Sequence, residues 1–450
     1  MGPHLLAIRF GTGLAPDRPP PADAGALLAE LDGPDTAARA FPIPDWAARM
    51  TAIGAFRQAR RARRRSDDPE AARAVFRRRR RDLNVQYQRD LAATLARAAV
   101  APTGIRERLA WFWADHFAVS DGNGPLRRSV AAYHDAALRP HLAGRFADLL
   151  RAAVTHPAML AYLDQGRSVG PGSPRGRARG EGLNENLARE VLELHTLGVG
   201  GPYGQDDVRE LAELLTGLTM DRDGAARFDR DRAEPGAEVV LGRRYGGARP
   251  NRHDIGAVLD DLAAHPATAR HVSRKLAVHF VADDPPPALV DAMAVAWTRT
   301  DGDLRAVYEV LFTHPAALSP DLAKVRRPLD LVAAAARATG LGAELPGVRV
   351  RVLRAFATDA MYAMGQAWLR PPGPQGWPEA AAAWITPQGL AARLDWALAT
   401  GRVVDGDPRA MLDAALGPIA SARTRFAVGA AEDRAAGRAL VLAVPEFQRR

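Results

Sequence analysis

The chain contains the run Gly182-Leu-Asn-Glu-Asn-Leu-Ala-Arg-Glu-Val-Leu-Glu-Leu-His-Thr-Leu-Gly198, which predicts a helix with acidic side chains beside its apolar stripe. At about 100° per residue from Asn186, Glu190 lies roughly at 40° and Glu193 roughly at 340°, on either side of Leu197. An unpaired charge beside a core is costly, so these carboxylates need arginine, histidine, backbone or metal partners. The run therefore predicts both a helical fold and a candidate site.

Helical periodicity continues on both sides of this run. It covers residues 105–118, 127–139 and 143–152 before the run, and 205–218, 253–264, 266–281, 286–299, 303–312, 325–338, 350–364, 387–399, 407–416 and 430–442 after it. Residues 221–252 lack helical periodicity, and Val239–Tyr245 is expected as a short strand or hairpin arm. We predict an all-α fold, a large multi-helix single domain with two lobes.

The expected organisation follows changes in composition along the chain. Residues 1–45 are rich in proline and glycine and are expected as an N-terminal arm packed on the main body. Residues 46–220 form the N-terminal helical lobe with the acidic helix, and 253–450 form the C-terminal lobe. The glycine-rich basic segment 165–182 is expected to be a flexible loop whose arginines can reach the acidic helix.

The composition excludes several kinds of site. The chain has 450 residues, a net charge of +9 and no cysteine, which rules out disulfides, thiolate metal sites and cysteine nucleophiles. Of 61 basic residues only Lys275 and Lys324 are lysines, a bias typical of GC-rich coding. The positive charge is therefore only weak support for a nucleic-acid partner, and we do not expect specific nucleic-acid binding.

Long basic helices are predicted over residues 55–100, with runs at Arg60–Arg65 and Arg77–Arg81. Two interpretations apply. The arginines are either solvated helix faces or a docking surface for nucleic acid, acidic protein or lipid headgroups.

The N-terminus lacks the basic segment and sustained apolar core of a signal peptide, and no stretch of about 18 apolar residues predicts a membrane span. A cytoplasmic location is the default expectation, and export together with a partner stays open.

Glu190 and Glu193 are the candidate catalytic or metal-ligating carboxylates, because residues three apart share one helix face. His116, expected to point inward among aromatic residues, and His141 are the candidate histidine ligands, which would complete a divalent-metal site. The alternative is a salt-bridge lattice, since Arg189 lies four residues from both Glu185 and Glu193. Histidines before proline, such as His156, are explained by helix capping.

Common catalytic motifs are missing from the sequence. It has no Gly-x-Gly-x-x-Gly after a strand, no phosphate-binding Gly-x-x-x-x-Gly-Lys and no His-Glu-x-x-His. Nucleotide-dependent functions are therefore not expected.

Further motifs follow in order along most of the chain: Trp111–Phe117, Arg139–Phe146, His156–Asp164, Asn184–Gly198, Leu241–Tyr245, His265–Ala269, Lys275–Pro287, Met364–Gln366 and Pro371–Pro378. With these motifs the chain resembles the bacterial family called "domain of unknown function 1800". The resemblance implies a mostly helical protein of unestablished activity. It also implies a partner, because members of this family are often encoded beside a sulfatase-like family, "domain of unknown function 1501", whose members commonly carry export signals.

The chain departs from the family pattern at three positions. The family tends to have asparagine where Asp115 stands, tryptophan where Leu218 stands and histidine where Ala233 stands. If that histidine is a ligand in the family, this chain lacks it, which favours a binding role over an enzyme.

Two functions are therefore expected as alternatives. The first is an accessory or binding protein that acts with a sulfatase-like partner, through the arginine helices and the Gly-Trp-Pro segment; the expected binding residues are Asn184, Asn186, Arg189 and Trp377. The second is a metal-dependent hydrolase that uses Glu190, Glu193, His116 and His141 in the helical core. A third hypothesis, binding of anionic polymers, predicts salt-sensitive retention on heparin.

Overall fold

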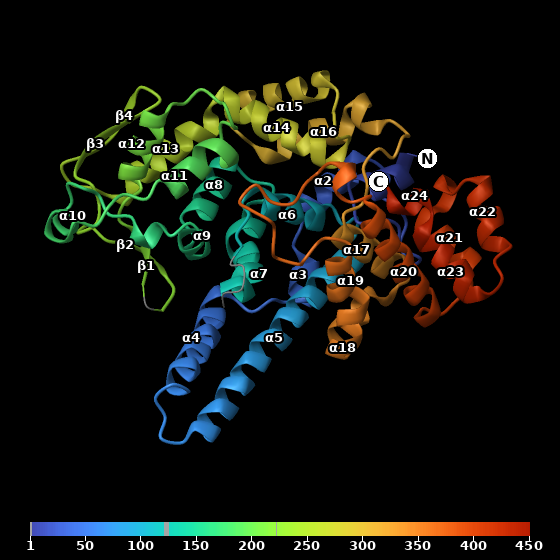
Figure 1. Ribbon diagram of the computed structural model, residues 1–450. Helices are drawn as coiled ribbons and strands as arrows, with labels where there is room; N and C mark the ends of the chain where they lie inside the picture. Colours follow the sequence, from blue (N-terminus) through green and yellow to red (C-terminus); the bar gives the residue numbers. More distant parts are fainter. Residues whose placement is uncertain (1, 121–125, 222) are drawn as a thin grey trace.

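Helices make up most of the structure, a computed structural model that describes residues 2–120, 126–221 and 223–450. Strands occur in two small hairpins, at the far end of the molecule from the C-terminal helices (Figure 1). The all-α prediction is confirmed.

The first half of the chain contains α1 (Gly2–Arg9), α2 (Ala24–Asp32), α3 (Thr36–Ala40), α4 (Trp46–Ala62), α5 (Pro69–Val100), α6 (Ile105–His116), α7 (Val130–Tyr133), α8 (Phe146–Val154), α9 (Pro157–Tyr162), α10 (Pro174–Arg179), α11 (Asn186–Glu190) and α12 (Gln205–Leu214). The second half contains α13 (Arg252–Ala264), α14 (Pro266–Phe280), α15 (Pro287–Arg299), α16 (Leu304–Thr313), α17 (Pro328–Ala338), α18 (Val350–Leu353), α19 (Asp359–Ala363), α20 (Pro387–Val403), α21 (Pro408–Leu416), α22 (Ala422–Gly429), α23 (Arg434–Ala443) and α24 (Pro445–Gln448).

Two of these helices, α9 and α14, begin at a His-Pro pair. Proline suits the first helical position because its missing N–H would be unsatisfied there, and the preceding histidine caps the helix. Nδ1 of His156 accepts a hydrogen bond from the backbone N–H of Ala158 at 3.1 Å, and Nδ1 of His265 accepts one from Ala267 at 3.1 Å. The expected capping role of these histidines is confirmed.

The segment 221–252 forms most of the two hairpins. Strand β1 (Leu218–Met220) pairs with β2 (Ala226–Phe228), and β3 (Gly236–Val240) pairs with β4 (Arg243–Gly247), both antiparallel. The strand expected over Val239–Tyr245 is the tip of the second hairpin. The chain reverses at Leu241 and Gly242, whose φ angles of 51° and 76° suit a two-residue hairpin turn.

Two hydrophobic clusters fill the interior. The first combines buried residues of α2, α6, α8, α12 and α13 to α16, so it continues across the 221–252 segment. The second combines α1, α5, α17 and α19 to α23. The N-terminal segment contributes to both clusters, through Phe10 and Leu27 to the first and Ile8 to the second. The two lobes with a boundary near 220–255 stay a prediction.

Helices α4 and α5 project from the body as a long two-helix hairpin (Figure 1). A small core of Met50, Ile53, Phe56 and Leu83 holds the two helices together, and the rings of Phe56 and Phe76 lie 5.4 Å apart. At its base the hairpin is joined by a buried ion pair, in which Nη2 of Arg49 donates to both carboxylate oxygens of Asp90 at 2.9 Å.

One buried carboxylate connects distant parts of the chain. Asp330 on α17 forms ion pairs with Arg326 at 3.0 Å, Arg450 at 2.8 Å and Arg108 of α6 at 3.4 Å. Burial by itself would raise the pKa of Asp330, but Arg108, Arg326 and Arg450 hold it far below its ordinary value. Arg450 also donates to the carbonyl oxygen of His279 at 2.8 Å, which extends the network to α14.

Within the described residues, no helix is both long enough and apolar enough to cross a membrane.

The Asp330 network gives a stability prediction. Asp330→Asn leaves three buried guanidinium groups without a counter-charge, so we expect it to lower the free energy of unfolding by about 3 to 5 kcal/mol. Urea denaturation followed by circular dichroism measures the change. The control is Asp359→Asn, which removes an exposed pair with Arg354 and is expected to cost less than about 0.5 kcal/mol. Equal effects of the two substitutions would contradict a structural role for the network.

Candidate functional site

The acidic helix changes its helical form in the middle. Residues Asn186–Glu190 are α-helical, but Val191–His195 form a π-helical turn, η5. In this turn the N–H of Leu197 donates to the carbonyl oxygen of Leu192, five residues back, at 3.0 Å. A π-turn holds more residues per turn than the 100° projection assumes, so that projection does not fix the positions of side chains beyond Glu190.

An arginine is paired with one of the two candidate carboxylates, Glu193. Arg189 lies 3.1 Å from Glu185 and 3.3 Å from Glu193, and it also donates to Oε1 of Gln205 at 3.0 Å. These contacts form the lattice that the four-residue spacing predicts. Glu190 is half-buried, and burial followed by the charge of Glu193 raises its pKa to about 6.

The other predicted binding residues next to this helix organise the loop before it. The amide group of Asn184 donates to the carbonyl oxygens of Leu163 at 2.9 Å and Asp164 at 3.1 Å. Its Oδ1 accepts from the backbone N–H of Asn186 at 3.0 Å, whose own side chain is exposed. Asn184 therefore fixes the start of α11. Whether Asn184, Asn186 or Arg189 binds a ligand stays a prediction.

The predicted metal ligands do not form a coordination group. In the described residues, only Glu210, Glu213 and Glu238 bring three ligand-type side chains within 4.8 Å of one another. Nε2 of His116 instead donates to the carbonyl oxygen of His195 at 3.2 Å, and His141 lies on the short helical turn Arg139–His141.

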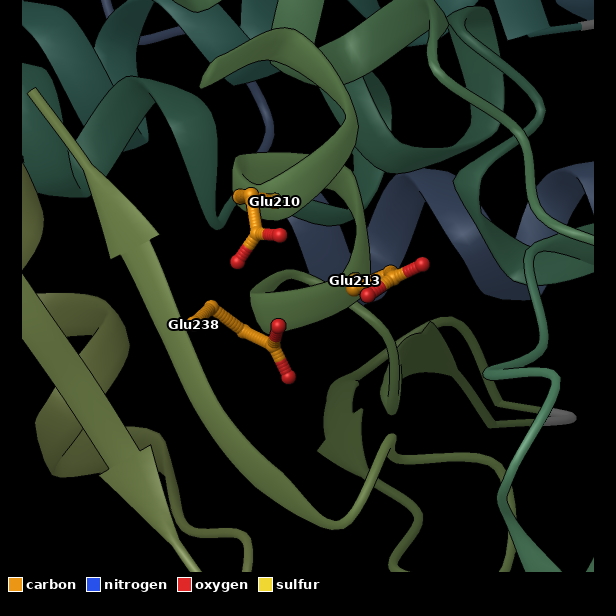
Figure 2. A group of neighbouring side chains, drawn as sticks. All are labelled: Glu210, Glu213 and Glu238. Carbon is orange, nitrogen blue, oxygen red and sulfur yellow. The ribbon is translucent and has the colours of Figure 1, made fainter. Parts of the chain in front are cut away.

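The three glutamates lie outside the predicted acidic helix: Glu210 and Glu213 are on α12, and Glu238 is on β3. Figure 2 shows the carboxyl group of Glu238 directed toward α12, which carries Glu210 and Glu213. Glu213 is paired with Arg209 at 3.1 Å, and Glu210 accepts from the backbone N–H of Val239 at 2.8 Å. Glu238 is only 8% exposed, and burial together with the two neighbouring glutamates raises its pKa to about 8.

A second polar group, here called the histidine–lysine pocket, lies between α6 and α14. This cavity of about 220 Å³ is lined from α6 by Phe112, Asp115 and His116, from α14 by His271, Arg274, Lys275 and Val278, and from a loop by Gln375, Trp377 and Glu379. The spacing along each helix, three or four residues, places these side chains on one face. His116 and Trp377 are the two predicted site residues that this pocket brings together.

The loop that closes the pocket, residues 366–379, is here called the strap. Gly376 of the strap has a φ of 80° and passes so close to α6 that a Cβ atom there would lie 2.5 Å from the carbonyl oxygen of Asp115. Nζ of Lys324 donates to the carbonyl oxygen of Glu379 at 2.8 Å, and Nδ1 of His279 donates to its Oε1 at 2.6 Å. The strap is therefore held in place at Gly376, against α6, and at Glu379, by Lys324 and His279.

The strap also lines two neighbouring cavities. A central cavity of about 80 Å³ includes Trp111, Asp115, Trp368 and Trp377 in its wall. A larger cleft of about 590 Å³, here called the basic cleft, lies between α5 and α18–α19. It combines arginines with Tyr87, Tyr362 and Trp368, and the arginines are Arg77, Arg80, Arg81, Arg127, Arg354 and Arg370.

Carboxylates in the histidine–lysine pocket are already neutralised. Arg327 donates to Oδ2 of Asp115. Burial would raise the pKa of Glu379, but His279 and Arg327 hold it well below its ordinary value. Burial lowers the pKa of His271 to about 4 and that of His116 well below its usual range, so both imidazoles are neutral near pH 7.

A family model described as "Protein of unknown function (DUF1800)" matches residues 7–449. The chain belongs to this family. The description of the DUF1800 family names no activity. Neither a curated protein nor a solved structure matches the chain. In this DUF1800 chain Ala233, where a histidine was expected for the family, is buried against the turn at Gly217.

Sequence reasoning missed Lys275 and Glu379 as site residues. The His279–Glu379 contact joins residues 100 positions apart, and no local spacing indicates it. The rarity of lysine could have drawn attention to Lys275, because only two of the 61 basic residues are lysines.

The glutamate triad gives a pH prediction. The folded-state pKa of Glu238 lies above its ordinary value, so the folded protein loses stability as the pH rises from about 4.5 through about 8. Glu238→Gln removes this loss. We expect the melting temperature of the variant, relative to that of the parent, to increase as the pH rises from about 5 to about 8.5. Thermal unfolding in the presence of EDTA measures this difference. Glu432→Gln, at an exposed position, is the control and should show no such trend.

Proposed function

We propose that this DUF1800 protein is an accessory protein that docks on an acidic surface of a sulfatase-like partner protein. The docking surface is the arginine arm, defined as residues 57–81 at the end of the α4–α5 hairpin. The observation that carries the proposal is the set of exposed arginines on this arm, which have no acidic partner in the part of the chain that the structure describes.

The arginine arm concentrates positive charge away from the body. All of its arginines are exposed, and within the described residues none forms an ion pair with a carboxylate; they are Arg57, Arg60, Arg61, Arg63, Arg64, Arg65, Arg73, Arg77, Arg78, Arg79, Arg80 and Arg81. Elsewhere on the surface arginines commonly have such partners, for example Arg145 with Asp301 and Arg305 with Asp32. Unpaired clustered charge favours and steers association with a surface of opposite sign.

The basic cleft adds a second kind of contact beside the arm. Tyr362 is 68% exposed at its rim, and Tyr87 and Trp368 form part of its wall. Arginine, tyrosine and tryptophan are the residues that contribute most to binding energy in protein interfaces. The combination supports a protein partner that offers both carboxylates and apolar side chains. The resemblance of the chain to its family adds the expectation that this partner is sulfatase-like.

The second candidate function, a metal-dependent hydrolase at Glu190 and Glu193, has less support. Glu193 is engaged by Arg189, and His116 and His141 do not join the two carboxylates in a ligand group. Elemental analysis of the purified protein separates the two functions. Stoichiometric metal that disappears in Glu190→Ala would favour the hydrolase.

Replacing the arm's arginines tests the docking proposal. We expect Arg77→Gln, Arg78→Gln, Arg79→Gln, Arg80→Gln and Arg81→Gln, combined in one variant, to weaken binding of the sulfatase-like protein from the same genome about tenfold or more. Each exposed charge pair contributes about 0.2 to 1 kcal/mol, and five act together. Isothermal titration calorimetry with the purified partner measures the change at two salt concentrations.

The control carries five glutamines at exposed arginines outside the arm and the cleft: Arg249, Arg299, Arg402, Arg423 and Arg434. It has the same net charge as the arm variant, so a loss confined to the arm variant supports docking at this surface. Equal losses in both variants would show a general charge effect. Tighter binding to duplex DNA than to the partner protein would replace the proposal with a nucleic-acid role.

A further inference from the structure

Lys275 is the unusual group in the histidine–lysine pocket. The other lysine of the chain, Lys324, contacts Asp283 at 2.5 Å and the carbonyl oxygen of Glu379 at 2.8 Å. Lys275, by contrast, lines the partly open histidine–lysine pocket and forms no hydrogen bond or ion pair with any described residue. Its side chain is half-buried, and a partly desolvated amine in a cleft that has no carboxylate partner is a candidate for a functional group.

Arginine could not replace lysine in a reactive role at this position. The guanidinium group stays protonated and does not act as an amine nucleophile, whereas a lysine amine loses its proton readily when it is desolvated. The chain uses arginine for nearly all of its 61 basic residues. A lysine inside a cavity therefore supplies a chemistry that the surrounding arginines do not.

The charged and titratable groups around Lys275 come from every element that encloses it. They are Asp115 and His116 of α6, His195 of η5, His271 and Arg274 of α14, and Glu379 of the strap. Both carboxylates are held by other cations, so neither is paired with the lysine. Burial consequently lowers the pKa of Lys275 to about 8, which leaves part of the amine unprotonated near neutral pH.

Two neutral histidines line the same pocket as Lys275. Nε2 of His116 donates to the carbonyl oxygen of His195, and Nε2 of His271 donates to that of Leu194, each at 3.2 Å. In both neutral rings Nδ1 then carries the lone pair. Nδ1 of His116 is buried and has no hydrogen-bond partner among the described residues. A neutral imidazole nitrogen of this kind can accept a proton from an amine or from a bound molecule.

We propose that the histidine–lysine pocket binds small carbonyl compounds and that Lys275 holds them as an imine. The cavity of about 220 Å³ is below the roughly 300 to 1,000 Å³ of pockets for drug-sized ligands, which suits a molecule of a few heavy atoms. Phe112 and Trp377 give it apolar walls, and Arg274 at its edge can pair with an anionic substituent.

The chemistry needs no oxidant or reductant. The lone pair on Nζ of Lys275 forms a bond to the carbonyl carbon while the C=O π electrons move to oxygen. A proton passes from nitrogen through Nδ1 of His116 to that oxygen. The C–O bond then breaks, the nitrogen lone pair forms the C=N bond, and one water molecule leaves with the second proton of the amine. The sum is amine plus carbonyl giving imine plus water.

Reductive trapping tests the proposal on the intact protein. The protein is incubated with glyoxylate and sodium cyanoborohydride at about pH 7.5, and adducts are located by peptide mass spectrometry. An internal standard comes from Arg402→Lys, which places an ordinary exposed lysine on α20. We expect Lys275 to be modified about tenfold faster than this introduced lysine, because a larger fraction of its amine is unprotonated. Lys275→Arg should abolish that adduct while leaving the standard reactive.

The size of the aldehyde supplies a second readout. Pyrenecarboxaldehyde is too large for the pocket, so it should label the introduced lysine but not Lys275. Modification of Lys275 by glyoxylate no faster than the introduced lysine would overturn the proposal. Equal labelling of both lysines by the large aldehyde would show that Lys275 reacts as a surface amine and would overturn it as well.

Discussion

The ion pairs of Asp330 hold together segments that the sequence keeps far apart. This carboxylate joins α17 to Arg108 of α6 and to Arg450, and Arg450 reaches the backbone of α14. These helices belong to different hydrophobic clusters, so the network fixes how the clusters meet. The histidine–lysine pocket lies between α6 and α14 and depends on that arrangement. Buried charge networks of this kind specify a geometry more than they add net stability.

Arginine and lysine serve different purposes in this molecule. Arginines fill the interior networks and cover the projecting arm, where a permanent charge is useful for pairing and docking. The two lysines both lie near Glu379: Lys324 contacts carboxylate and carbonyl groups, whereas Lys275 has no direct partner among the residues that the structure describes. The exposed arginines of the arm and the half-buried amine of Lys275 therefore suit different tasks.

Much of the fold could be predicted from local sequence, and little of the pocket could. Apolar periodicity indicated the helices, the His-Pro pairs indicated helix starts, and the spacing of Arg189 from Glu185 and Glu193 indicated their ion pairs. The π-turn after Glu190 could not be predicted, because it depends on packing rather than on spacing. Glu379 meets His279 only after the strap has folded over α14, and Glu238 meets α12 only through the second hairpin.

The strap is a shared wall of three spaces, since its residues line the basic cleft, the central cavity and the histidine–lysine pocket. Trp368 contributes to the first two and Trp377 to the last two. A partner in the cleft and a small molecule in the pocket would thus both contact this short segment. If one occupant changes the affinity for the other, the second changes the affinity for the first by the same factor. The strap would then couple docking at the basic cleft to binding in the histidine–lysine pocket.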